Sequence, residues 1–324
     1  TDPVIFSGKN IAVAMSNAQD FSNDCCDRQH PGGYNSTLDG VHAFVDGIVL
    51  EVEKKMRDYQ GREADPGEIC CSRTIACAYK KWGLDFMKHL EGEFACAVWD
   101  GPNETLVIAR DPYGHKPLHY FSDAGSFIFS SEIKGILQNG IKPELDWTSL
   151  SDFLTLNNVP FPKTMFQNVY QVAPGSMLIV NRNGLTQQSY WEPEFAVKEQ
   201  GLEETIIQIS DALKSAVKKR MTNDETFCFL SGGIDSSAVI SYASELSSKP
   251  VHAISVGFEE EETNELEDAA EMAAHVGAKH HQVIAKPDSF FDMLQTMVKH
   301  HDIPFTDTSA YPTYFAAKTA RPYT

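Results

Sequence analysis

Short apolar runs rich in β-branched and aromatic residues follow one another along the first half of the chain. They predict strands at 41–45, 94–99, 105–109, 118–121, 127–129 and 177–180. Asp46-Gly47 and Asp100-Gly101 come directly after two of these runs and predict turns. Helical stretches are predicted between the runs, at 75–90 and 150–156. The first half is therefore predicted to be a mixed α+β domain.

The second half changes to a regular alternation of helices and strands. Apolar residues at helical spacing predict a first helix, and they are Ile206, Ile207, Ile209, Leu213, Ala216 and Val217. Strands are then predicted at 226–230, 251–256 and 280–284, with helices at 236–247 and 266–276 between them. This order predicts a parallel sheet with crossover helices. Polar and acidic residues cluster between Trp191 and Glu203, so we expect domains at 1–195 and 196–324.

Composition narrows the possible partners. The length of 324 residues suits two domains of ~150 residues each. The net charge of −18 repels the negatively charged phosphates of a nucleic acid, so no nucleic-acid partner is expected. No apolar run reaches the ~20 residues of a membrane span, so no membrane partner is expected. The 7 cysteines are odd in number and form no Cys-x-x-Cys, which favours reduced thiols in a cytoplasmic protein.

The segment with the clearest chemistry is Phe229–Ser237, where an apolar run leads into two glycines and then a helix. Glycine permits a tight turn and a close ligand, and a helix start presents free N–H groups. Ser231, Ser236 and Ser237 add hydroxyl donors, so the segment predicts a phosphate-binding loop. Asp235 alone would repel a phosphate, and we expect it to hold Mg²⁺ against one.

The simplest alternative for this segment is a strand–turn–helix capped by Ser or Asp. A lone Gly-Gly turn is usually no more than that. The string is neither a Walker loop, since it lacks Gly-Lys-Ser/Thr, nor the dinucleotide Gly-x-Gly-x-x-Gly. The full string, with a strand before it and a helix after it, favours the phosphate site.

Ser-Gly-Gly-Ile-Asp-Ser-Ser at 231–237 resembles the PP-loop of ATP pyrophosphatases. Five further strings resemble those of one family within that class, and they lie at 91–100, 110–118, 130–134, 190–193 and 304–314. They occur in the family's order over nearly the whole chain. The sequence therefore resembles the glutamine-hydrolysing asparagine synthetases.

The resemblance implies two domains. The first is a class II glutamine amidotransferase-like domain of N-terminal-nucleophile type, αββα in its layers, which we expect to be incomplete at its N-terminus. The second is an α/β PP-loop domain with a parallel sheet that binds ATP, which we expect to be incomplete at its C-terminus. The family's ATP-binding positions fall on Leu230, Ser231, Gly232, Gly233, Asp235, Ser236, Ser237 and Val256. Glu265 and Glu267 lie where the family has acidic residues, and Phe305–Ser309 where it binds the acyl substrate.

The reaction implied is AMP-forming amide-bond synthesis with ATP and Mg²⁺ as cofactors. ATP adenylates a small-molecule carboxylate, pyrophosphate leaves, and ammonia or an amine attacks the acyl-AMP. The loop and Mg²⁺ would neutralise the charge that develops on pyrophosphate. Members of the family are often homodimers, so a homodimer is a possible assembly.

The glutaminase positions depart from the family pattern. Thr1 stands first, where the family has a nucleophilic cysteine, and our alignment places Thr1 inside the first domain rather than at its catalytic start. The family's oxyanion-stabilising Asn-Gly is Asp46-Gly47 here, and a carboxylate opposes a developing negative charge. The family's Gly-Ser-Asp aligns with a string that ends at Cys71, and its Arg-Leu-Ser-Ile falls near 16–18. We therefore expect a degenerate glutaminase site with unknown catalytic residues.

Three alternatives remain beside an asparagine synthetase-like enzyme. One is a lactam-forming synthetase of the same family, in which the amine is on the substrate. The second is a PP-loop enzyme that modifies tRNA, which the acidic charge and the first domain disfavour. The third is an inactive nucleotide-binding homologue, which the intact loop disfavours. His280-His281, His300-His301 and the acidic run at 259–262 are interpreted as ordinary residues rather than metal ligands.

Overall fold

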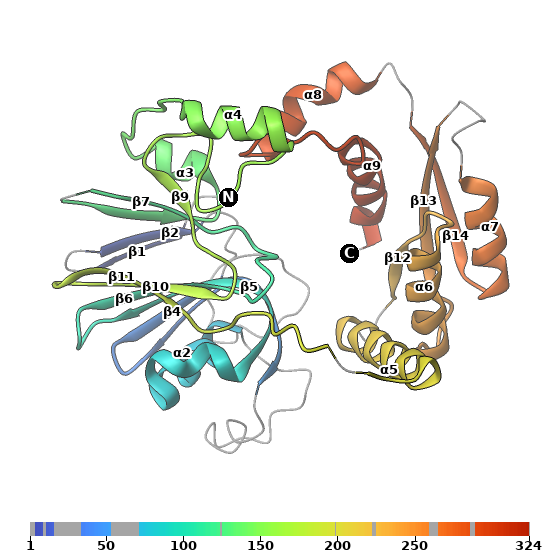
Figure 1. Ribbon diagram of the computed structural model, residues 1–324, viewed down its shortest axis with the longest axis horizontal. Helices are drawn as coiled ribbons and strands as arrows, with labels where there is room; N and C mark the ends of the chain where they lie inside the picture. The colour runs from blue at the N-terminus through green and yellow to red at the C-terminus, as the bar shows by residue number, and fades with distance from the viewer. Residues whose placement is uncertain are drawn as a thin grey trace. The chain divides into compact units, whose positions relative to one another are not determined.

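The chain forms two compact units (Figure 1). Unit 1 comprises Thr1–Glu194 with Asp302–Pro304, and unit 2 comprises Phe195–His301 with Phe305–Thr324. The computed structural model describes residues 4–8, 11–15, 34–52, 71–123, 125–197, 199–221, 225–258, 265–285 and 289–323. None of the helices in these ranges combines the length and the apolar composition that crossing a lipid bilayer requires.

Unit 1 is built on an antiparallel sheet of six strands in the order β11-β10-β6-β5-β4-β3. Its strands are β3 (Tyr34–Leu38), β4 (Val41–Val52), β5 (Leu90–Asp100), β6 (Thr105–Arg110), β10 (Ser176–Asn181) and β11 (Gly184–Ser189). A second sheet has the order β8-β7-β9, with β7 (His119–Ser122), β8 (Phe127–Ser130) and β9 (Val169–Gln171). β1 (Val4–Gly8) and β2 (Ile11–Met15) form a separate antiparallel pair. The helices are α2 (Cys71–Trp82), a 3₁₀ helix (Gly83–His89), α3 (Ile133–Leu137) and α4 (Trp147–Leu156).

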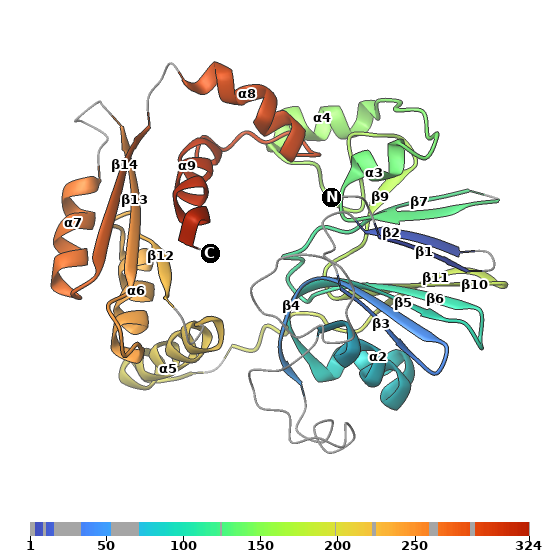
Figure 2. The ribbon, with the colours of Figure 1, turned by 180° about the vertical axis from the view of Figure 1, so that it is seen from behind.

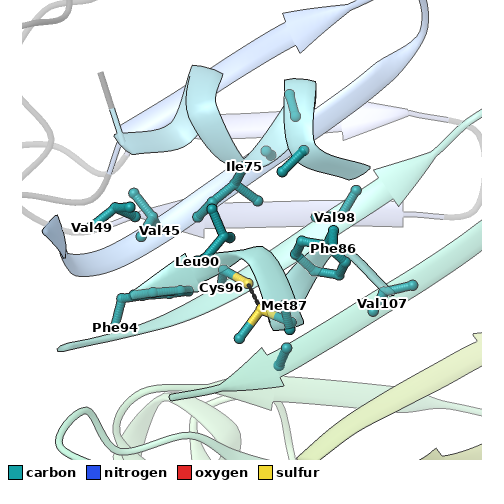
Figure 3. Packing of buried hydrophobic residues seen from close by; sticks show 14 of the residues in the cluster. Val45, Val49, Ile75, Phe86, Met87, Leu90, Phe94, Cys96, Val98 and Val107 are labelled. Atoms are coloured by element: carbon teal, nitrogen blue, oxygen red, sulfur yellow. Dashed lines mark hydrogen bonds between the residues drawn. The ribbon is translucent and has the colours of Figure 1, made fainter. Parts of the chain in front are cut away.

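Both faces of the six-stranded sheet are buried because side chains alternate along each strand. In β5, Phe94, Cys96 and Val98 face one cluster, whereas Ala95 and Ala97 belong to another. The first cluster packs under α2 and the 3₁₀ helix and is shown in Figure 3, where the sulfur atoms of Met87 and Cys96 meet at 4.0 Å. Its labelled members are Val45, Val49, Ile75, Phe86, Met87, Leu90, Phe94, Cys96, Val98 and Val107.

The other face of this sheet packs against the second sheet. Tyr120, Phe127 and Phe129 of β7 and β8 pack on the cluster that contains Ala95 and Ala97. The alternate residues of the same strands, Phe121 and Ile128, pack instead on a cluster with α3. The buried clusters thus give a succession of helix, sheet, sheet and helix. The assignment of unit 1 to the N-terminal-nucleophile type stays a prediction.

Residues 302–304 complete unit 1 from a distant part of the sequence. The carboxylate of Asp302 accepts the backbone N–H of Ile133 at 2.6 Å and the ammonium of Lys134 at 3.1 Å. Ile303 packs on the cluster formed by Ile133 and Ile136. Asp302 therefore supplies an acceptor to the first turn of α3, whose own preceding residue, Glu132, makes no side-chain cap.

One local prediction for unit 1 is wrong, and a second differs from the structure in its bounds and helix type. Asp46-Gly47 does not turn the chain, because β4 continues through it and Gly47 pairs with Phe94 of β5. The helical stretch predicted at 75–90 begins earlier, at Cys71, and its last part is a 3₁₀ helix that ends before β5. Gly83, at φ 58°, marks the change from one helix type to the other.

Unit 2 contains a parallel sheet of three strands in the order β12-β13-β14, as the alternation of helices and strands predicts. The strands are β12 (Phe227–Phe229), β13 (His252–Phe258) and β14 (Lys279–Ala285). The helices are α5 (Leu202–Arg220), α6 (Ile234–Leu246), α7 (Leu266–His275), α8 (Ser289–His300) and α9 (Ala310–Ala320), followed by a 3₁₀ turn (Arg321–Tyr323). Figures 1 and 2 show α7 and α9 on opposite sides of this sheet.

Candidate functional site

The phosphate loop leaves the parallel sheet at Leu230, which is only 2% exposed. Its N–H donates to the carbonyl of Ile254 at 2.9 Å and continues the pairing of β12 with β13 by one bond. Its carbonyl accepts the hydroxyl of Ser255 at 2.6 Å. The last residue before the loop is therefore fixed on both sides of its backbone.

Gly232 holds the loop against the start of α7. Its φ is +87°, and a Cβ at this position would lie 2.9 Å from the Cβ of Asp268 and 3.1 Å from the backbone nitrogen of Ala269. The carbonyl of Glu265 is only 3.2 Å from the same point. Only glycine combines this left-handed backbone with so close a neighbour.

Two of the three serines in the loop, Ser231 and Ser236, bond to each other and to the loop backbone. The N–H of Ser231 donates to the Oγ of Ser236 at 3.2 Å, and the two hydroxyl oxygens are 3.0 Å apart. The N–H of Gly233 donates to the Oγ of Ser231 at 3.3 Å, and Ser236 donates its hydroxyl to the carbonyl of Gly233 at 3.1 Å. These are short-range bonds at an exposed site, so the oxygens of an anion can take their place.

The loop also precedes the N-terminus of α6, which begins at Ile234. The residue at its N-cap is Gly233, which has no side chain to bond the N–H groups of the first turn. The first intrahelical bond runs from the N–H of Ser237 to the carbonyl of Gly233 at 3.1 Å. Free N–H groups, the helix dipole and the serine hydroxyls therefore converge on one exposed turn, which suits a phosphate.

Asp235 is exposed in the first turn of α6. The described part of the chain contains no group of three or more His, Cys, Asp or Glu that could hold a metal ion. One carboxylate fits a Mg²⁺ ion that is otherwise bound by phosphate oxygens and water, which is how Mg²⁺ is usually held beside nucleotides. The metal role of Asp235 stays a prediction.

The family resemblance implies further site positions in the second domain, and the structure links some of them to the loop but not others. Val256 lies on β13, paired with Val283, two residues after Ile254, whose carbonyl accepts the Leu230 N–H. Glu265 precedes α7 and brings its carbonyl beside Gly232, whereas Glu267 is exposed in the first turn of α7. In the segment predicted to bind the acyl substrate, Asp307 accepts the N–H of Ser309 at 2.8 Å just before α9.

In unit 1, Asp46, which is predicted to stand at an altered glutaminase position, forms an ion pair. The carboxylate of Asp46 is 3.6 Å from the ammonium of Lys116, and both side chains are partly exposed. The backbone next to Asp46 is tightly packed, because a Cβ on Gly47 would lie 2.1 Å from the carbonyl oxygen of Glu93. Cys71 is the first residue of α2, and its side chain, like residues 1, 16–18, 69–70 and 259–262, lies outside the described residues.

The string 110–118 forms a rigid loop that carries Lys116. The guanidinium of Arg110 donates to the carbonyls of Gly114, Lys116 and Val172 at 2.8, 2.7 and 3.0 Å. The fully buried carboxylate of Asp111 accepts the N–H groups of Tyr113, His115 and Lys116. The two charged side chains hold the loop, and Lys116 points from it toward Asp46.

The side chains of Cys77, Cys96 and Cys228 are buried. Burial raises the pKa of Cys96 to about 12. Burial raises the pKa of Cys228 as well. A thiol with a raised pKa is a poor nucleophile near neutral pH.

Sequence reasoning missed the side chains that support the loop from other segments. Ser255 is 2% exposed and polar within an apolar strand, which is a signal that could have marked it. His280 contacts Ser255 at 2.8 Å, although its place in a histidine pair gave no sign of this contact.

Two family models match the chain in succession. The glutamine amidotransferase domain matches residues 70–191, and asparagine synthase matches residues 208–323. The protein named asparagine synthetase [glutamine-hydrolyzing] 1 of Bacillus subtilis (strain 168) is 32% identical over 254 residues, 77% of this chain and 40% of that protein. A putative asparagine synthetase [glutamine-hydrolyzing] of Mycobacterium bovis is 31% identical over 283 residues, 84% of this chain and 43% of that protein.

A third relative has a different name. The protein named amidase chry2 of Gibberella zeae is 36% identical over 217 residues, 64% of this chain and 31% of that protein. Among solved structures, the glutamine phosphoribosylpyrophosphate amidotransferase from B. subtilis has a TM-score of 0.32 at 14% identity, over 78% of this chain and 48% of that one. An overlap this low does not establish a shared fold.

The chain spans less than half the length of each of these three relatives. The two family models match neighbouring segments in the order that the sequence motifs predict. The synthetases among the relatives align over most of the chain. This chain therefore belongs to the glutamine-hydrolysing asparagine synthetase family.

Proposed function

We propose that the protein is an ATP-dependent, AMP-forming amide-bond synthetase that adenylates a small-molecule carboxylate and transfers it to ammonia or an amine. A carboxylate resists attack by an amine until one of its oxygens becomes part of a good leaving group. Adenylation supplies that leaving group, and the departing pyrophosphate needs donors that match its charge. The reaction therefore requires a pyrophosphate site built from N–H and hydroxyl groups.

The single observation that carries the proposal is the loop at 231–237. Its serine hydroxyls and backbone N–H groups bond to one another at 3.0–3.3 Å, next to the open N-terminus of α6. In this proposal the triphosphate replaces these internal bonds, and Asp235 holds Mg²⁺, which would offset the charge on the leaving pyrophosphate. Leu230 and Val256 would flank the adenine.

We propose that the nitrogen does not come from glutamine through unit 1. The Asp46 carboxylate, with Lys116 at 3.6 Å, stands where a glutaminase needs a neutral donor for the oxyanion. The amine is then free ammonia, or an amine on the same substrate, in which case the product is a lactam.

The test is a pyrophosphate-release assay on the full chain with MgATP, ammonium and a panel of carboxylates that includes aspartate. Pyrophosphate should form with at least one acid and stay at background without acid. Asp235→Asn should lower the rate by at least about tenfold, since it removes the carboxylate assigned to Mg²⁺. Asp211→Asn, an exposed carboxylate on α5, is the matched control and should leave the rate unchanged.

Glutamine in place of ammonium separates the sources of nitrogen. The proposal expects no glutamate above background. Glutamate release would show that unit 1 is a working glutaminase, and failure both to bind MgATP and to release pyrophosphate would exclude the synthetase.

A further inference from the structure

The strand end that leads into the phosphate loop is held by side chains that lie outside the loop. The carbonyl of Leu230 accepts the hydroxyl of Ser255 at 2.6 Å. The oxygen of that hydroxyl lies 2.8 Å from the Nε2 of His280, and the Nδ1 of His280 lies 3.3 Å from the amide nitrogen of Gln282. A continuous chain of hydrogen bonds thus runs within unit 2 from β14 across β13 to the end of β12.

The Leu230 carbonyl at one end of this series of hydrogen bonds can only accept, and this fixes which atom donates in each bond. A carbonyl oxygen only accepts, so the single hydrogen of the Ser255 hydroxyl points to Leu230. The Ser255 oxygen must then accept from His280, which assigns the imidazole hydrogen to Nε2. Nδ1 is left to accept from the amide of Gln282. Burial lowers the pKa of His280, and the charge of His281 lowers it further, which agrees with a neutral ring.

The hydrogen bond to the Leu230 carbonyl orients one backbone amide of the proposed phosphate site, the N–H of Ser231. The peptide bond between Leu230 and Ser231 is planar and trans, so its N–H points away from its C=O. Holding the Leu230 carbonyl toward Ser255 therefore turns the Ser231 N–H the opposite way, where it donates to the Oγ of Ser236 at 3.2 Å. Ser231 is the first residue of the loop, so its N–H is the loop donor that follows β12 most directly in the sequence.

We propose that Gln282, His280 and Ser255 form a positioning relay that orients the Ser231 N–H for an anion and so raises the affinity of the loop for the pyrophosphate part of MgATP. The inference rests on the proposed function of the loop as a nucleotide site. His280 and Ser255 are positioning residues, because they act through Leu230 and do not touch the ligand.

His281 provides a matched control on the same strand. Its Nε2 lies 2.9 Å from the Nδ1 of His252, and the two rings stack with centroids 5.1 Å apart. Replacing it removes an imidazole and its contacts from β14 and leaves the contact between His280 and Ser255 in place. A loss of affinity that came only from a weakened β14 would therefore appear in both histidine variants.

The experiment measures binding of MgATP and, separately, of inorganic pyrophosphate with Mg²⁺ to the full chain by calorimetry. Ser255→Ala and His280→Leu should lower the affinity for both ligands by about 5- to 30-fold, because each variant loses one orienting hydrogen bond. His280→Gln should stay within about twofold of the unaltered chain, because its amide nitrogen can donate to Ser255 in place of Nε2. His281→Leu should stay within about twofold as well.

Equal affinities in the unaltered chain, Ser255→Ala and His280→Leu would overturn the relay and leave the proposed function intact. A loss in His281→Leu as large as in His280→Leu, or a loss in His280→Gln, would overturn it too. If Ser255→Ala fails to fold, the three histidine variants decide alone.

A second measurement does not depend on ligand. Hydrogen exchange of the Ser231 amide, followed by NMR without nucleotide, should accelerate in Ser255→Ala and His280→Leu but not in His280→Gln. If the unaltered chain binds neither ligand, the proposed function is wrong. Unchanged exchange in the variants would then overturn the relay as well, whereas faster exchange would support its orienting role.

Discussion

The loop of unit 2 that is predicted to bind phosphate and the position of unit 1 that is predicted to be an altered glutaminase site differ in what their polar atoms bind. In the loop, Ser231 and Ser236 bond to each other and to neighbouring backbone at an exposed turn. At the altered position, the carboxylate of Asp46 faces Lys116, and the backbone of Gly47 is pressed against Glu93. The first arrangement can exchange its bonds for those of a ligand, whereas the second is occupied by its own charges.

Under the proposed function, the difference teaches that unit 1 keeps its fold without its chemistry. The six-stranded sheet of unit 1 is buried on both faces by hydrophobic clusters, and Asp46 belongs to neither cluster. The loop of unit 2 has no such independence, because the residues that shape it are also those that would bind the ligand.

The largest expected effect concerns the backbone of unit 1. Gly47→Ala places a Cβ 2.1 Å from a carbonyl oxygen at a φ of +118°, so we expect a loss of about 4 kcal/mol in the free energy of unfolding of unit 1. All 4 tryptophans lie in unit 1, so urea unfolding followed by tryptophan fluorescence reports on this unit.

Gly140→Ala is the control for Gly47→Ala. Its φ is +87°, but nothing lies within 4 Å of the added Cβ, so it should cost only about 1 kcal/mol. Equal losses in the two variants would show that strain at positive φ, not the contact with Glu93, governs position 47.

A pH effect of about 3 kcal/mol is expected in the same unit. Burial, with the charge of Arg110, lowers the pKa of His119 from 6.5 to about 4, and the side chain is 5% exposed. The unfolded state binds the proton more tightly, so this contribution to stability is complete above pH 6.5 and is lost as the pH falls toward 4. His119→Gln should remove this part of the pH dependence in fluorescence-monitored unfolding, and equal slopes in both proteins would contradict it.

In unit 2, Gly232→Ala should lower the affinity for MgATP by at least about 30-fold, or about 2 kcal/mol of binding free energy, measured by calorimetry. The added Cβ would meet Asp268 at 2.9 Å and push the loop away from α7. Gly277→Ala, at a φ of +68° with open space around it, is the control and should bind MgATP normally. Normal binding by Gly232→Ala would mean that the loop tolerates a displacement from α7.

The smallest effect is expected at Asp46. Replacing Asp46 with Asn breaks the pair with Lys116, and because both side chains are partly exposed the change in unfolding free energy should stay below about 1 kcal/mol. The variant should still release no glutamate from glutamine, since the resemblance to the family predicts two further altered recognition positions. Glutamate release by this variant alone would show that position 46 is the only obstacle.

The sequence predicted the strands and helices that are marked by a pattern within their own residues. Short apolar runs located β4, β5, β6 and β10, and helical spacing located α5. The Asp46-Gly47 turn failed because pairing with β5 overrides a two-residue signal. Ile48 is exposed and Val49 is buried, as side chains on opposite faces of a strand are. The pairing with β5 shifts its register between Val49 and Glu51, and Val52 beyond the shift is buried again.

The strand, turn and helix around residues 231–237 were predictable because the local residues carry the shape of this segment, whereas its binding of phosphate stays a prediction. The supports of this segment were not predictable, since Ser255 lies 25 residues from the carbonyl that it holds, and His280 lies another 25 residues further on. No pattern in a single sequence links such positions. The same applies to Asp302, which lies 169 residues from the N–H that it accepts.

That last contact has a consequence for how the protein is made. Unit 1 takes Asp302–Pro304 from beyond most of unit 2, so a ribosome adds 169 residues after Ile133 before the carboxylate that accepts the Ile133 N–H exists. A fragment that ends at Glu194 would lack this tripeptide. Such a fragment would expose the apolar surface of α3 that Ile303 covers, and it would need those three residues grafted back before it could serve as an isolated domain.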